Sequence, residues 1–175
     1  MDAPVEGNRA AGDSDEKPSP AVQRVLERFS GDVLSRHAYR GDDTLVIKRE
    51  AVVDVCRFLK AEPDLRFDLF LDLTAVDYLP VEPRFEVVIH LYSTPHGLRM
   101  RLKVPLAGDD PEMDTLTSVW RATDWFEREA WDMYGIVFRG HPNLKRILLY
   151  EEFEGHPLRK DYPIDKRQPL IGPKN

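Results

Sequence analysis

Apolar residues alternate with polar ones most regularly in the middle of the chain. The alternation runs through Phe67–Leu73, Phe85–Leu91 and Leu98–Val104. Alternation of this kind is typical of strands with one buried face. The residues between the stretches, 77–83 and 93–97, are rich in turn formers. The pattern predicts an antiparallel meander of three strands, in which all the alternating apolar residues of each stretch point into the core.

The polar positions of this meander carry many charges. Three basic residues alternate with the apolar residues of the third stretch: Arg99, Arg101 and Lys103. Because opposite charges on neighbouring strands attract, we expect Glu86, Asp68 or Asp72 to lie opposite Arg99 or Arg101. A solvated sheet face explains these charges better than a functional basic patch, since exposed ion pairs are common and individually weak.

Helical spacing precedes the meander in two places. Pro20–Phe29 and Glu50–Lys60 each gather their apolar residues on one face, as amphipathic helices do. Two short stretches lie between them, Val33–Tyr39 and Thr44–Ile47, and we expect these to be strands joined by a turn at residues 41–43.

Further helices are predicted after the meander. Residues 116–120 have the spacing of a short helix. Asp124 and Glu127 fit a capping box for a second helix, and Gly135 is a plausible end for it. The expected fold is α+β: a mostly antiparallel sheet with helices packed on one face, followed by an extended C-terminal tail.

Composition divides the chain into three regions. Residues 1–20 are acidic, with prolines and almost no large apolar side chain, so we expect a disordered tail. Residues 21–150 form the α+β domain. Residues 151–175 are proline-rich and largely basic and lose all periodicity. A segment of this kind has no core of its own, so we predict an extended tail that binds a partner.

Charge and cysteine content narrow the classes of function. The 175 residues carry a net charge of -6, whereas nucleic-acid-binding domains usually have a basic excess. A single cysteine, Cys56, cannot form an internal disulfide or hold a cluster or structural zinc, and its helical spacing suggests a small buried apolar residue. The sequence has no apolar run of membrane-spanning length and no secretory signal pattern. We expect a soluble protein of a reducing compartment, without a cofactor or metal of its own.

The stretch after residue 126 is the richest in candidate chemistry. Arg128 and Asp132 are four residues apart, so on a helix they can form an ion pair. Glu129 and Asp132 could serve as an acid and a base. A structural ion-pair network is the better interpretation, because no nucleophile or histidine lies at a useful spacing.

Histidines and aromatic residues in this region suggest contact surfaces. His141 and His156 each stand in a Gly-His-Pro sequence, where the proline favours an extended backbone at the histidine. A shared metal site would need two further ligands, so surface or interface turns are the preferred interpretation. Trp125, Trp131 and Tyr134 spread around a helix at about 100° per residue, and some of that surface is expected to meet another molecule.

The residues from Thr123 to Pro163 resemble the C subunit of the proton-pumping NADH:quinone oxidoreductase, respiratory complex I. The resemblance begins in Glu127-Arg128-Glu129, Asp132 and Met133-Tyr134, and continues through Lys145, Ile147 and Leu148 to a Gly-His-Pro-Leu-Arg-Lys-Asp-Tyr-Pro run. The family-motif and interface positions that it implies are Glu127, Arg128, Glu129, Asp132, Tyr134, Gly135, His141, Pro142, Arg146, Gly155, His156, Pro157, Arg159, Lys160, Asp161, Tyr162 and Pro163.

The resemblance implies a non-catalytic structural subunit of the peripheral arm. Such a protein lies on the cytoplasmic side of the bacterial inner membrane and packs against subunits D, B and I, of which D forms the quinone site and B and I carry clusters. It meets the membrane arm only indirectly, and quinone and NADH only through the complex. FMN and iron–sulfur clusters are expected in partner subunits and none in this chain, and nucleic acid is not a partner.

Three alternatives stay open at this stage. Related chains occur in membrane-bound hydrogenases and in ferredoxin-fed quinone oxidoreductases, so the electron donor is inferred. A free-standing enzyme would use Glu129 and Asp132, and a membrane-surface adaptor would use the basic tail. In the preferred hypothesis, the charged helix orders the Gly-His-Pro turns, and Arg159, Lys160 and Asp161 pair with charges of the quinone-site subunit.

Overall fold

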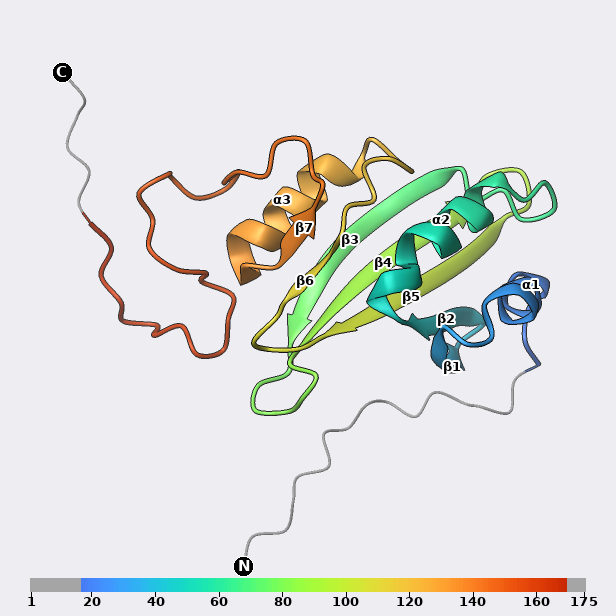
Figure 1. Cartoon of the computed structure of the whole chain (residues 1–175), viewed down its shortest axis with the longest axis horizontal. Helices are drawn as coiled ribbons and strands as arrows, with labels where there is room; N and C mark the ends of the chain where they lie inside the picture. The colour runs from blue at the N-terminus through green and yellow to red at the C-terminus, as the bar shows by residue number, and fades with distance from the viewer. Residues whose placement is uncertain (1–16, 170–175) are drawn as a thin grey trace, which may run out of the picture.

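The computed structural model describes residues 17–169, and these residues form the predicted α+β fold (Figure 1). The predicted acidic tail lies outside the described residues as far as Glu16, and so does the end of the predicted C-terminal tail from Leu170. Pro20 is already the first residue of a helix, with Ser19 as its N-cap: the Ser19 hydroxyl accepts a hydrogen bond from the Val22 N–H.

The described residues contain three α-helices, one short 3-10 helix and seven strands. The helices are α1 (Pro20–Phe29), η1 (Arg49–Ala51), α2 (Val52–Ala61) and α3 (Thr123–Tyr134). The strands are β1 (Val33–Tyr39), β2 (Asp42–Ile47), β3 (Leu69–Asp77), β4 (Phe85–Ser93), β5 (Leu98–Leu106), β6 (Glu112–Asp114) and β7 (Val137–Arg139).

Five strands form the main sheet, in the order β1-β2-β5-β4-β3. The predicted meander is confirmed, because β3, β4 and β5 pair antiparallel in sequence order. The pairing of β2 with β5 is parallel, and β6 and β7 form a separate parallel pair. Helix α2 lies across the sheet, whereas α3 lies beside the edge strand β3 (Figure 1). The edge of β3 is therefore where the residues after α3 can meet the sheet.

The predicted alternation is wrong in the first strand of the meander. Leu69 and Leu71 are 42% and 39% exposed, while Phe70 is buried. The cause is a β-bulge between Phe70 and Asp72, where β3 has one more residue than β4. An extra residue reverses which side chains face the core, so Phe70 and Leu73 point inward and Leu69 points outward.

The charges on the outer face of the sheet pair differently from the prediction. Glu86 meets Lys103 at 2.8 Å, rather than either arginine. Asp68 accepts hydrogen bonds from the Thr94 backbone and hydroxyl, and the Arg99 guanidinium lies over the Tyr92 ring. Register explains the first pairing, because Val88 of β4 lies opposite Lys103 and places Glu86 diagonally across from it.

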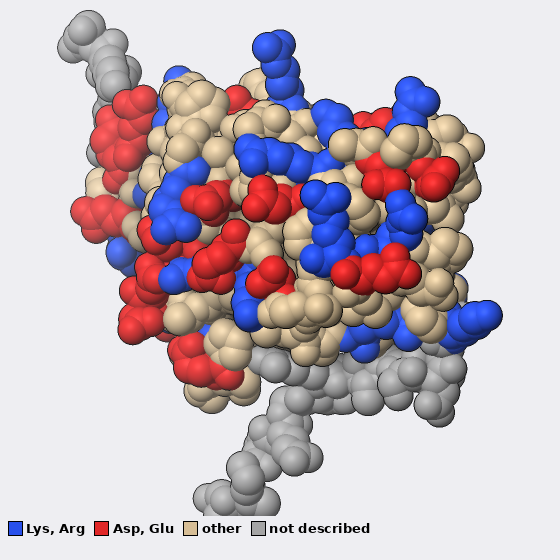
Figure 2. Space-filling view, turned by 45° about the vertical axis from the view of Figure 1, so that its right-hand side comes forward, with Lys and Arg blue, Asp and Glu red and all other residues tan. Residues whose placement is uncertain are grey.

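The molecular surface shows no single dominant charge on the side drawn in Figure 2. Basic and acidic side chains are intermingled there, with acidic groups more frequent toward the left-hand edge. This mixture agrees with the negative net charge in giving no broad basic surface on that side.

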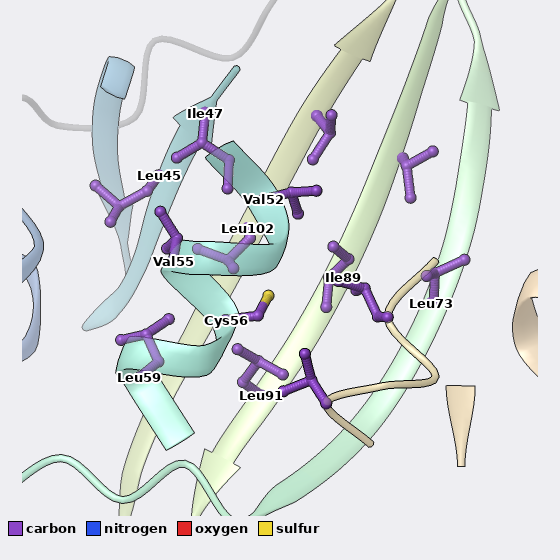
Figure 3. Packing of buried hydrophobic residues seen from close by; sticks show 14 of the residues in the cluster. Leu45, Ile47, Val52, Val55, Cys56, Leu59, Leu73, Ile89, Leu91 and Leu102 are labelled. Atoms are coloured by element: carbon purple, nitrogen blue, oxygen red, sulfur yellow. The ribbon is translucent and has the colours of Figure 1, made fainter. Parts of the chain in front are cut away.

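The core lies between α2 and the sheet (Figure 3). The apolar face of α2 packs on side chains from the strands, and each side chain of leucine size that is buried in this way contributes about 1.5–3 kcal/mol. The packed residues that Figure 3 labels are Leu45, Ile47, Val52, Val55, Cys56, Leu59, Leu73, Ile89, Leu91 and Leu102. Cys56 is fully buried, which confirms its interpretation as an apolar core residue, and burial raises the pKa of its thiol.

Residues 116–120 form a turn rather than the predicted short helix. The N–H groups of Val119 and Trp120 both donate to the Leu116 carbonyl, but the Leu116 N–H itself donates to the Glu127 carboxylate of α3. The turn is thus tied to α3 through the Leu116 N–H. Its apolar residues are still buried, with Leu116 and Trp120 in the core.

Candidate interaction site

Helix α3 and the chain that follows it hold nearly all the residues singled out from the sequence. After β7, residues 140–169 contain no helix or strand and run around the outer side of α3 (Figure 1). These residues, 140–169, are called the C-terminal segment below. A stretch of this length without regular structure needs partners for its backbone groups, and the side chains that supply many of them are described below as its anchors.

Glu127 anchors α3 to the turn before it. The side chain is fully buried, and its two oxygens accept hydrogen bonds from the Thr115 hydroxyl at 2.5 Å and the Leu116 N–H at 2.7 Å. The predicted capping box is wrong, because α3 begins after Ala122 with no side-chain cap. Glu127 faces inward, toward Thr115 and Leu116, and does not bond the backbone at the N-terminus of α3 as a capping box requires.

Burial raises the pKa of Glu127, although its hydrogen bonds and nearby His141 oppose the effect. A raised pKa means that folding favours the protonated acid. The associated stability is present below the unfolded pKa of about 4.3 and is lost as the pH rises through the folded pKa.

We therefore predict that Glu127→Gln costs less than about 1 kcal/mol at pH 7, since the amide keeps the shape and one acceptor without a buried charge. Urea unfolding at pH 4 and pH 7 tests this. The difference in free energy of unfolding, variant minus wild type, should become more positive as the pH rises. A cost of several kcal/mol at pH 7 would mean that the ionised carboxylate is needed.

His141, in the first Gly-His-Pro turn, lies against the same region of α3. Its side chain is fully buried, and Nε2–H donates to the Asp124 carbonyl at 3.2 Å, with the Glu127 carboxylate 4.0 Å away. The N–H of Asn143 donates to Nδ1 at 3.0 Å, while Pro142 is exposed in the turn. The imidazole therefore fixes where the C-terminal segment leaves β7.

Asp132 is the main anchor of the C-terminal segment. The carboxylate is fully buried and accepts four hydrogen bonds, one from Arg146 Nη1 at 2.6 Å and three from the N–H groups of Ile147, Leu148 and Leu149 at 3.0 Å each. Burial alone would raise the pKa of Asp132, but these donors outweigh it and hold the pKa below its usual value. A single side chain of α3 thus orders four consecutive residues.

The predicted pairing of Arg128 with Asp132 is wrong. Arg128 donates to the carbonyls of Lys145 and Arg146 and lies over the Trp125 ring. Asp132 turns inward, where Arg146 reaches it from the returning chain. Local spacing on the helix does not decide the pairing, because the C-terminal segment brings more donors.

Glu129 and Asp132 are not arranged as a catalytic pair. Glu129 is exposed, while Asp132 is buried and held by Arg146 and three backbone N–H groups. A carboxylate with four donors and a lowered pKa is a poor general base. Asp132 therefore has a structural role: it holds the C-terminal segment on α3.

The C-terminal segment also caps the end of α3. The last four residues of a helix leave their carbonyls without partners. Here Gly135 N–H donates to the Trp131 carbonyl, His156 Nδ1–H to that of Asp132, Leu158 N–H to that of Met133 and Arg159 Nε–H to that of Tyr134. His156, Leu158 and Arg159 thus supply three of these four donors, and the ring of His156 also contacts the Trp131 ring edge-on.

Gly135 is the residue that permits this cap. It has φ +74, a left-handed conformation, and a Cβ there would lie 2.5 Å from Arg159 Nη2 and 2.6 Å from His156 Nε2. Both backbone conformation and space therefore require glycine. The predicted helix end at Gly135 is confirmed.

We predict that Gly135→Ala lowers the free energy of unfolding by about 2–4 kcal/mol, the sum of backbone strain and displaced side chains. Gly97→Ala is the matched control, because Gly97 has φ +64 and nothing within 4 Å of its Cβ position. Gly97→Ala should lower the free energy of unfolding only by the backbone strain, about 1 kcal/mol. Thermal unfolding of the two variants compares them, and equal losses would show that His156 and Arg159 do not press on Gly135.

A second anchor joins the C-terminal segment to the sheet. Arg84 bridges two aspartates: its Nε and Nη2 contact Asp77 at 3.0 and 2.8 Å, and its Nη1 and Nη2 contact Asp161 at 3.0 and 2.8 Å. The Lys160 N–H donates to Asp77 at 2.9 Å. Asp161, for which a charge of another protein was expected, thus meets Arg84 of its own chain with both oxygens.

The two aspartates differ in burial but not in the direction of their pKa. Burial alone would raise the pKa of Asp77, yet hydrogen bonds from Arg84, Leu79 and Lys160 hold it at about 2. For Asp161 the Arg84 hydrogen bonds are the main cause of a lowered pKa. Both carboxylates are therefore ionised at neutral pH, and both are engaged within the chain.

The sequence interpretation missed Asp77 and Arg84. A usable signal was present, because Asp77 continues the buried positions Leu73 and Ala75 at an interval of two residues. An acid at a core position of a strand requires a partner, and Arg84 stands beside Phe85, the residue paired with Asp77 across the turn.

The remaining predicted positions close the loop of the C-terminal segment. Gly155 has φ +98, and a Cβ there would meet the Tyr162 ring at 2.9 Å. The rings of Phe153 and Tyr162 stack with centroids 6.1 Å apart. Pro157 is half-buried and Pro163 is exposed. These contacts hold the chain around Phe153 and Gly155 against Tyr162.

Residues 17–169 contain neither a cluster of metal ligands nor a helix that could span a membrane. No group of three or more His, Cys, Asp or Glu side chains in this range is arranged to hold a metal ion, and His141 and His156 bind separate backbone carbonyls. Within the same range, each helix is too short or too polar to cross a membrane.

Comparison with known proteins identifies relatives over most of the chain. Residues 45–168 match the family described as the 30 Kd subunit of respiratory-chain NADH dehydrogenase. A protein of Citrifermentans bemidjiense, named as the C subunit of an NADH-quinone oxidoreductase, is 47% identical over 154 residues, which is 87% of this chain and 94% of that protein.

Two solved structures have the same fold. A trypsin-resistant fragment of Nqo5 is 33% identical and has a TM-score of 0.61, covering 71% of this chain and 99% of the fragment. A chain of the membrane-bound sulfane sulfur reductase, an archaeal respiratory membrane complex, is 26% identical with a TM-score of 0.69, covering 82% of this chain and 84% of the other.

Proposed function

Since the chain belongs to the family of the 30 Kd subunit of respiratory-chain NADH dehydrogenase and is a subunit of an NADH-quinone oxidoreductase, we propose that α3 and the C-terminal segment are its docking surface for the other subunits. The partners in this proposal are subunits D, B and I, the first at the quinone site and the other two carrying clusters. The chain acts as a scaffold that holds these proteins in register and transforms no substrate itself.

The observation that carries the proposal is the apolar surface of this region. Trp125, Leu148 and Leu158 are 63%, 62% and 51% exposed, and Ile164 is fully exposed. All four lie on α3 or the C-terminal segment. Exposed large apolar side chains are common in protein–protein contacts, and burying each of them on a partner contributes about 2 kcal/mol.

The anchors of the segment support the same conclusion. Asp132 and Arg84 form their hydrogen bonds with residues of their own chain, and thereby hold the exposed side chains in fixed positions before any partner arrives. A preordered surface loses less conformational entropy on binding than a flexible one. The charged residues thus serve recognition by making the surface rigid.

The proposal places the chain in the peripheral arm, on the cytoplasmic side of the inner membrane. Electrons would pass through FMN and iron–sulfur clusters of the partner subunits, with no cofactor bound here. The similarity to a chain of a sulfane sulfur reductase complex supports a scaffold role that is compatible with more than one electron donor. Quinone and NADH would then be met only through the complex.

Affinity purification from solubilised membranes tests the proposal. We expect the tagged chain to bring down flavin- and cluster-containing subunits. The double variant Leu158→Glu and Ile164→Glu should recover at least about tenfold less of these subunits while keeping the melting temperature of the chain, since both side chains are exposed. Leu34→Glu is the matched control, because Leu34 is 53% exposed on β1. Recovery of the wild-type chain alone would contradict the proposal.

A further inference from the structure

Arg159 stands out among the cations of the C-terminal segment because of where its guanidinium lies. It is half-buried, its Cζ is 5.2 Å from the centre of the Phe85 ring, and its Nη2 lies close over Gly135. Its Nε–H donates to the Tyr134 carbonyl at 2.5 Å. One of the five N–H groups of this arginine therefore has an acceptor that is part of the α3 cap.

The other N–H groups of Arg159 have no acceptor among residues 17–169. No carboxylate in this range lies within 4.0 Å of the guanidinium, although Asp77 and Asp161 are near it. Both aspartates are already used by Arg84, which also repels Arg159. Burial and then Arg84 lower the pKa of Arg159, and the charges of Asp161 and Asp77 only partly oppose this effect.

The neighbouring charges favour an anionic partner. Arg84 is shared by Asp77 and Asp161, so neither of these carboxylates is left for Arg159, and Lys160 is exposed and forms no ion pair within the described residues. Another half-buried arginine of this segment, Arg146, does have a carboxylate, that of Asp132. The two terminal NH2 groups of the Arg159 guanidinium have no acceptor within the described residues, and such a pair suits a carboxylate held by two hydrogen bonds.

We propose that Arg159 receives the carboxylate of an aspartate or glutamate side chain from a neighbouring protein of the complex. This inference rests on the proposed docking function and names the chemistry of one contact within it. Of the three charged residues expected to pair with a partner, Asp161 is taken by Arg84 and Lys160 is exposed to solvent, so Arg159 is the specific contact. An ion pair formed there would lose water on assembly, which is when such pairs contribute most to specificity.

Zero-length cross-linking in the intact complex tests the contact directly. Carbodiimide joins an amine to a carboxylate only when the two are in contact. The test chain carries Arg159→Lys together with Lys160→Arg, which moves the reactive amine by one position and keeps the charge. The control chain carries Lys160→Arg alone. Both are incorporated into the complex, treated with carbodiimide and analysed by peptide mass spectrometry.

The expected result is a cross-link between position 159 and an acidic residue of another protein in the complex, present in the test chain and absent from the control. A cross-link only to Asp77 or Asp161 of the same chain, or no cross-link at all, would overturn the inference. Failure of both chains to enter the complex would instead count against the proposed function, so the two failures are distinguishable.

A binding measurement gives a second, independent test. Arg159→Gln should weaken binding of the chain to the remaining subunits at least about tenfold and make the residual binding less sensitive to salt. Lys160→Gln should change the binding affinity less than about threefold. Melting temperatures of the isolated variants separate the loss of the cap from the loss of the contact. Wild-type affinity and salt dependence in Arg159→Gln would contradict the inference.

Discussion

Replacing Asp132 by alanine should lower the free energy of unfolding by about 3–5 kcal/mol, the largest loss expected for a single side chain of α3. The substitution leaves Arg146 without its carboxylate and three consecutive N–H groups, those of residues 147–149, without an acceptor. Each buried group that loses its partner keeps its desolvation cost. Since domains of this size are stable by about 5–15 kcal/mol, urea unfolding should detect the change readily.

Two control variants are needed to interpret the Asp132→Ala result. Glu129→Ala, three residues earlier at an exposed position, should stay within about 0.5 kcal/mol of wild type. Asp132→Asn should fall between the two, because the amide oxygen can still accept from backbone N–H groups but does not balance Arg146. If Asp132→Ala were as mild as Glu129→Ala, the C-terminal segment would not depend on this carboxylate.

Replacing Arg84 by methionine should cost about 3–5 kcal/mol at pH 7, because it leaves Asp77 buried without a cation. It should also release Asp161 and loosen the C-terminal segment. Lys103→Met is a suitable control, since the partly exposed pair of Lys103 with Glu86 is expected to contribute no more than about 1 kcal/mol. Similar losses in both variants would contradict the assigned role of Arg84.

The Arg84 effect should depend on pH in a defined direction. Asp77 has a pKa of about 2 in the folded protein, below its ordinary value of 3.8. A lowered pKa gives stability that is present above the unfolded pKa and is lost as the pH falls through the folded pKa. The shift corresponds to about 2 kcal/mol of folding stability. This stability is lost as the pH falls from about 4 to about 2. The difference between wild type and Arg84→Met should therefore shrink over that range, and a constant difference would mean that Asp77 is not the group concerned.

The sequence alone identified the α+β class, the antiparallel meander and the family. Alternation with a period of two identified β4 and β5, helical spacing identified α1 and α2, and Gly135 marked the end of α3. These features depend on neighbours along the chain, which the sequence contains directly. The stretch from residue 123 to residue 163 resembles the same family that the comparisons identify.

The tertiary structure decided which charges meet and which apolar residues stay exposed. Asp132 pairs with Arg146 instead of Arg128, and Asp161 joins Arg84, a residue 77 positions away. The bulge in β3 exposes Leu69, although the apolar pattern placed it inside. The physical reason is that hydrogen bonds and ion pairs act over a few ångströms in space. Their partners are fixed only when the C-terminal segment returns to the end of α3 and the edge of the sheet.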